Sequence, residues 1–133
     1  MARVDDWVGR GDDGPVLFDR HTVLLLLRPE DAPELGAEEL DRLQDAHLAR
    51  QADLHDQGLL IAAGPLADQD DVAIRGIAVL SMDVESSRRL YDDDPLVRAG
   101  QLSVRSMTWL VPAGGVRFEQ VPFPRSMSEA LGD

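Results

Sequence analysis

The chain has 133 residues, a formal net charge of −12 and no cysteine. Its length suits one domain with a real hydrophobic core. The negative charge repels phosphate backbones and anionic lipid surfaces, and no apolar run approaches the roughly 20 residues of a membrane span, so we expect neither nucleic acid nor a membrane as partner. A chain without cysteine fits a reducing compartment, and its N-terminus lacks the apolar core of a signal peptide. We therefore expect a cytoplasmic protein.

The first two elements along the chain are a strand and a long helix. Residues 21–28, HTVLLLLR, form a short apolar run that ends before Pro29 and predicts a buried strand. Residues 37–57 contain no glycine or proline, are rich in helix formers and stop at Gly58, which predicts a helix.

The remaining segments predict three strands and more helix. Asp83 is placed to cap a short helix over residues 85–91, and Asp94-Pro95 starts a further helical turn that Gly100 ends. The predicted strands are residues 59–66, 74–82 and 102–111.

The resulting order, βαββαβ, is typical of a ferredoxin-like α+β domain, with a four-stranded antiparallel sheet and two helices on one face. Several predicted strands have apolar side chains at both odd and even positions, which point to opposite faces of the sheet. Both faces must therefore be covered by other parts of the protein. We therefore expect a homodimer in which two sheets pack face to face as a dimeric α/β barrel.

This domain is expected over residues 21–112, between an N-terminal extension, residues 1–20, and a C-terminal arm or tail, residues 113–133. Apolar residues between Val116 and Phe123 predict an extra edge strand or an arm that clasps the dimer. For the last residues two alternatives stay open: a disordered tail, or a helix whose start carries the capping box Ser126 and Glu129.

His47 is the first candidate for chemistry. At about 100° per residue, it falls on the same stripe of the long helix as three leucines and should face the sheet. The leucines are Leu40, Leu43 and Leu54, and the solvated far side should carry Asp41, Arg42, Asp45, Asp53 and Asp56. A core histidine held by one hydrogen bond remains the alternative.

Asp94 is the second candidate, because a carboxylate fixed at a helix start can also orient an imidazole. Arg75 and the backbone amides near Gly64-Pro65 are candidate anion and substrate binders, although Gly64-Pro65 can simply end a strand. The sequence contains no phosphate-binding glycine loop and no zinc or calcium motif, so we expect no metal site and no cofactor.

Three segments, AHLARQADLHDQGLLIAAGPL, RGIAVL and DDPLVRAGQLSVRSMTWL, occur in an order and spacing that resemble the YciI-like (YCII-related) family. The resemblance covers about residues 46–110 and implies a ferredoxin-like fold, a dimer and an active-site His/Asp pair that maps onto His47 and Asp94. One branch of the family looks like dehalogenating enzymes that remove HCl from chlorinated hydroxyaromatic compounds, whereas many members have no assigned reaction.

Our leading functional hypothesis is a small cofactor-independent enzyme of lyase or hydrolase type. His47 would act as general acid or base and Asp94 would orient it, on a hydroxyaromatic or activated carbonyl substrate. The rival hypothesis is a non-catalytic dimeric module that binds a small molecule or another partner. A haem or quinone monooxygenase is a weaker third reading, because fold alone does not fix function.

Overall fold

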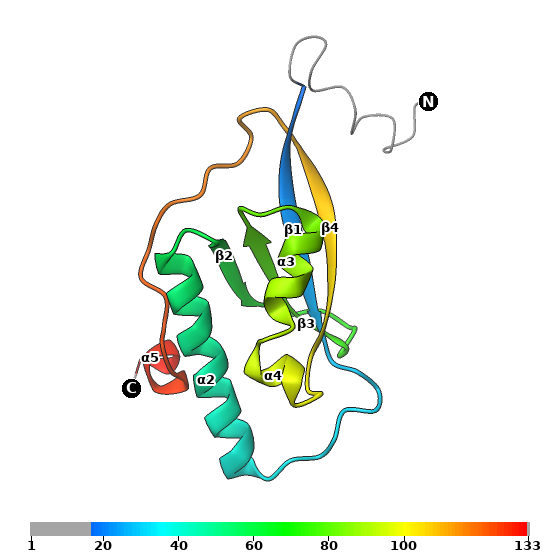
Figure 1. The fold of residues 1–133 in the computed structure, drawn as a ribbon, viewed down its shortest axis with the longest axis vertical. Coiled ribbons are helices and arrows are strands. Elements are labelled where there is room, and N and C mark those ends of the chain that lie inside the picture. Colours follow the sequence, from blue (N-terminus) through cyan, green and yellow to red (C-terminus); the bar gives the residue numbers. More distant parts are fainter. Residues whose placement is uncertain (1–16, 133) are drawn as a thin grey trace.

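The computed structural model describes residues 17–132 (Figure 1). Residues 1–16 of the predicted N-terminal extension lie outside the described residues. The elements follow the order β1, α2, β2, β3, α3, α4, β4 and α5. The predicted α+β ferredoxin-like fold is confirmed.

Four antiparallel strands form one sheet in the order β2-β3-β1-β4. The apolar strand β1 lies in the centre and begins three residues earlier than predicted, at Phe18. The strands are β1 (Phe18–Leu27), β2 (Leu60–Pro65), β3 (Ile74–Leu80) and β4 (Ser103–Pro112).

The two longer helices, α2 (Ala37–Asp56) and α3 (Val84–Tyr91), lie on the same side of the sheet (Figure 1). Asp83 caps α3 by accepting the backbone N–H of Ser86, as predicted. The helical turn expected at Asp94-Pro95 is α4 (Pro95–Arg98).

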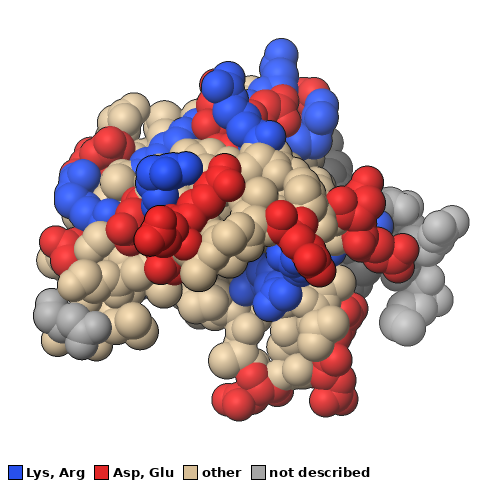
Figure 2. Space-filling model, turned by 90° about the horizontal axis from the view of Figure 1, so that it is seen from below, with Lys and Arg blue, Asp and Glu red and all other residues tan. Residues whose placement is uncertain are grey.

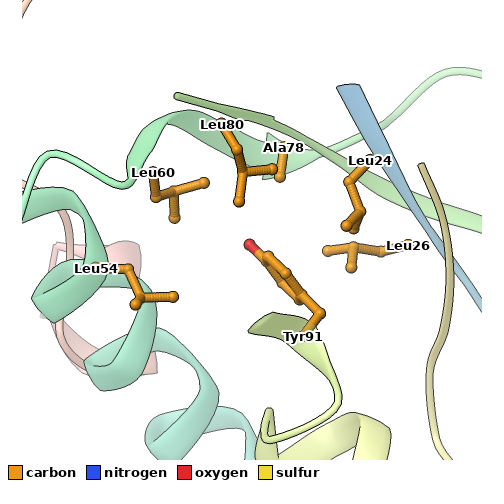
Figure 3. Close-up of a cluster of buried hydrophobic side chains, with 7 residues drawn as sticks. All are labelled: Leu24, Leu26, Leu54, Leu60, Ala78, Leu80 and Tyr91. Atoms are coloured by element: carbon orange, nitrogen blue, oxygen red, sulfur yellow. The ribbon is translucent and has the colours of Figure 1, made fainter. Parts of the chain in front are cut away.

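The hydrophobic core lies between this side of the sheet and the helices (Figure 3). Leucines of β1 and β3 point toward Tyr91, which α3 inserts between the sheet and α2. The cluster consists of Leu24, Leu26, Leu54, Leu60, Ala78, Leu80 and Tyr91. Because Leu24 and Leu26 face the helices, the alternate side chains of β1 face the other side of the sheet.

That other side is also apolar. Val23 pairs with Val79 of β3 and with Met107 of β4 in the sheet register. Met107 and Trp109 on the same face are 38% and 43% exposed. No helix of the described chain covers this face in Figure 1.

The C-terminal segment forms an arm and not an edge strand. After β4 the chain turns back and runs along α2 to the short helix α5 (Met127–Leu131) (Figure 1). Ser126 caps α5 by accepting the N–H of Glu129, while the Glu129 carboxylate accepts the N–H of Arg125. Of the two alternatives for this segment, the capped helix is therefore present.

The charged face of α2 is exposed as predicted, and the arm adds binding partners that the prediction did not include. Arg125 binds Asp53 and Asp56 at 2.8 and 2.6 Å, and Asp45 accepts the N–H of Met127 at 2.8 Å. These carboxylates are exposed, but they bind a segment 69 to 82 residues away in sequence, which helical periodicity cannot reveal.

Among the helices of the described chain, none has the length and apolar character needed to cross a lipid bilayer.

Candidate functional site

Helix α2 carries His47 on the side that faces the core. The buried residues of this helix are His47, Gln51, Ala52, Leu54 and His55. His47 and Leu54 lie on the buried side as predicted, but Leu40 and Leu43 are only half-buried. The buried stripe is therefore more polar than expected, and its polar side chains need partners.

Asp94 supplies the partner of His47. It is fully buried at the start of α4, where its Oδ1 accepts the backbone N–H groups of Leu96 and Val97 at 2.9 and 3.3 Å. Its Oδ2 lies 2.6 Å from His47 Nδ1. The capping role and the imidazole-orienting role considered for Asp94 thus coexist in one side chain.

This geometry defines the state of the imidazole ring. A carboxylate that accepts hydrogen bonds on both oxygens requires His47 Nδ1 to be the donor. In the neutral ring Nε2 is then unprotonated and carries a free lone pair. No described residue forms a hydrogen bond with His47 Nε2.

His47 lines a cavity of about 980 Å³ between α2, the ends of β2 and β3, α4 and the C-terminal arm. Gly64, Pro65 and Arg75, the candidate substrate binders, line the same cavity, whereas Asp94 lies behind His47 and does not. The structure therefore brings together the predicted site residues, with Asp94 in the outer position. Their functional roles stay predictions.

The chain matches the model of the YCII-related domain family over residues 22–109. The chain belongs to this family. A search of curated proteins finds no significant match.

In this YCII-related domain, the C-terminal arm builds one wall of the cavity although it lies outside the region that matches the family. Val121, Phe123 and Met127 of the arm all contribute to the lining. The sequence suggested an arm, and a tail that departs from the family pattern and can reshape or cover the pocket. It did not show which arm residues reach the cavity, because the contacts of the arm with α2 are set by tertiary structure.

Two further residues of the cavity wall were not identified from the sequence. Arg28, just after β1, donates from Nη1 to Gln101 Oε1 at 3.2 Å, and Gln101 Nε2 donates to the carbonyl of Pro33 at 2.6 Å. Gln101 is only 4% exposed. The arginine that directly follows the apolar run of β1 was the available signal, since a charge at the end of a buried strand often reaches into a site.

Beside His47, the polar pair of Gln51 and Tyr91 closes the inner side of the site. Gln51 Nε2 donates to the Tyr91 hydroxyl at 3.3 Å, and both residues are buried. Burial raises the pKa of Tyr91 to about 12. This phenol therefore stays neutral at ordinary pH, packs in the hydrophobic core and accepts the hydrogen bond from Gln51.

Helix α2 carries a second buried histidine, His55, whose two ring nitrogens are both engaged. Its Nδ1 donates to the carbonyl of Leu60 at 2.7 Å, and its Nε2 accepts the N–H of Val121 at 3.4 Å. Phe123 stacks on the ring at a centroid distance of 3.9 Å. His55 thus joins α2 to β2 and to the arm.

Within residues 17–132, no group of three or more His, Cys, Asp or Glu side chains is arranged to hold a metal ion.

Proposed function

We propose that this YCII-related domain is a small acid–base enzyme in which His47 exchanges a proton with a molecule in the cavity and Asp94 orients the ring. The observation that carries the proposal is the buried 2.6 Å contact between His47 Nδ1 and Asp94 Oδ2 at the wall of a cavity. We infer that Nε2 is the nitrogen within reach of a substrate, because Nδ1 points at Asp94.

In the proposed reaction His47 Nε2 takes a proton from an acidified O–H or C–H group. The imidazolium that forms is stabilised by the adjacent Asp94 carboxylate, and the proton is later returned to the product or to a leaving group. Acid–base catalysis of this kind contributes roughly 10²–10⁴-fold in rate. This gain suits hydroxyaromatic or activated carbonyl substrates, including dehalogenase-like or other lyase reactions, and the proposal requires no cofactor.

The test is a screen for turnover with two readouts: deuterium uptake at the acidic carbon of activated carbonyl compounds, and chloride release from chlorinated hydroxyaromatic compounds. His47→Gln should keep the fold and lower any turnover by about 10²–10⁴-fold. Arg42→Gln, an exposed change on the opposite side of α2, should leave the rate unchanged. Full activity in a folded His47→Gln variant would contradict the proposal, and the absence of any turnover would favour the binding-module alternative.

We also propose that the protein is a cytoplasmic homodimer formed through the face of the sheet that no described helix covers. Val23, Val79, Met107 and Trp109 lie on this face; Val23 and Val79 are buried, whereas Met107 and Trp109 are exposed. Exposed large apolar side chains beside a buried apolar strip favour association. Light scattering should give the mass of a dimer for the native chain and of a monomer for Trp109→Arg. A native monomer would overturn the proposal.

A further inference from the structure

We infer that the molecule taken up by the cavity is a small carboxylate with an apolar body, bound by Arg28 and Arg75. This deepens the proposed function by naming the substrate class, but it concerns binding and does not require turnover.

The first argument is the charge of the cavity wall. Arg28 and Arg75 both line the cavity, and neither forms an ion pair with any residue between 17 and 132. Asp68, exposed in the loop after β2, is the acidic residue of the described lining. The cavity wall thus carries an excess of positive charge in a chain whose net charge is −12 and whose surface carries clusters of acidic side chains (Figure 2).

The second argument is that Arg28 is held in place without being neutralised. Its backbone N–H binds the carbonyl of Ala73 at 2.7 Å, and its Nη1 binds the buried amide of Gln101. Gln101 is itself fixed by its bond to Pro33. An amide oxygen orients a guanidinium but leaves its charge uncompensated, so an anion is the partner that completes the site.

The third argument comes from a β-bulge. Leu26 pairs with Gly76 and Leu27 with Ile74, so Arg75 is the extra residue of β3 at this point. Bulges often occur beside functional sites, where they redirect a side chain. This bulge lies at Arg75, the second arginine of the cavity wall that also contains Arg28.

The rest of the wall determines the body of the ligand. Leu26, Leu48, Leu96, Leu102 and Phe123 are apolar and line the same cavity. An apolar body gains from burial there, whereas a doubly charged phosphate would face many apolar neighbours with only two guanidinium groups. A planar monoanionic carboxylate on an aromatic or aliphatic body fits both parts of the wall.

The probe is 4-hydroxybenzoate, compared with its neutral isostere 4-hydroxybenzamide in NMR or calorimetric titrations of the full chain. The carboxylate should bind at least tenfold more tightly than the amide. Arg28→Gln should weaken carboxylate binding at least tenfold and leave amide binding unchanged. Arg88→Gln, an exposed change on α3 away from the cavity lining, should have no effect on either ligand.

Equal affinity for the two probes, or unchanged carboxylate binding in Arg28→Gln, would overturn the inference. Tighter binding of phenyl phosphate than of 4-hydroxybenzoate would overturn the assignment to a carboxylate. If Arg28→Gln does not fold, Arg75→Gln at an exposed position carries the same test. The proposed function fails separately: His47→Gln with full turnover would contradict catalysis, while its binding of 4-hydroxybenzoate would still support the anion site.

Discussion

His47 and His55 lie two turns apart on the same face of α2, and both are buried, at 7% and 2% exposure. His55 has a backbone partner at each ring nitrogen and an aromatic ring stacked on it, so it can only hold elements together. His47 has a carboxylate at one nitrogen, no described partner at the other, and a cavity beside it. Burial of a histidine therefore says little about its role; the partners of its two nitrogens are more informative.

The largest change in stability is expected at Asp94, the carboxylate partner that distinguishes His47 from His55. Asp94→Ala removes a helix cap and leaves buried N–H groups without an acceptor. The cap contributes about 0.5–2 kcal/mol through these N–H groups, and the buried His47 Nδ1–H, which also loses its acceptor, costs about 1–3 kcal/mol, so we expect a loss of roughly 2–4 kcal/mol in the free energy of unfolding.

Urea unfolding monitored by circular dichroism measures this loss. The matched control is Asp93→Ala, because Asp93 is exposed and binds only Arg98 on the surface. The control should stay within about 0.5 kcal/mol of the native chain. Equal stability of the two variants would show that Asp94 does not hold the site as described.

Tyr91 provides a test of the core packing, because its hydroxyl binds Gln51, which lies between the two histidines on α2. Burial raises its pKa to about 12, above the unfolded value of about 10. The stabilising effect of the neutral phenol is complete below pH 10 and is lost as the pH rises toward 12, with a total of about 2–3 kcal/mol.

Tyr91 is the only tyrosine in the sequence, so its ultraviolet titration can be followed without interference from other tyrosines. Tyr91→Phe should remove this loss of stability between pH 10 and 12. A titration midpoint near 10 in the folded protein would contradict the buried position of the phenol.

The smallest expected free-energy change concerns the contact between His55 and the C-terminal arm. The stacked rings of His55 and Phe123 should be coupled by about 0.5–1.5 kcal/mol in a double-mutant cycle with His55→Ala and Phe123→Ala. Additive changes in unfolding free energy would mean that the arm does not rest on His55.

Much of the fold was predictable because it depends on local patterns. The apolar run before Pro29, the uninterrupted helix ending at Gly58 and the Asp83 cap each specify an element through propensity and capping. Element order then limits the topology to few choices.

The site was predictable only in part. The helical stripe and the family resemblance identified His47 and Asp94, which lie 47 residues apart and meet at 2.6 Å. Arg28 and Gln101 were not identified, and the contacts of the arm residues with the cavity could not be located, because these positions depend on long-range contacts. Asp45, Asp53 and Asp56 lie on the exposed side of α2 as predicted, but their binding partners could not be foreseen for the same reason, since these come from the arm.

Carbethoxylation by diethyl pyrocarbonate, located by mass spectrometry, tests most directly whether His47 has a ring nitrogen that a molecule in the cavity can reach. This reagent attacks an unprotonated imidazole nitrogen. In the folded protein we expect modification of His47 and protection of His55, whose nitrogens are both hydrogen-bonded. In urea both should react alike. Protection of His47, or equal reaction of the two histidines in the folded state, would contradict the account.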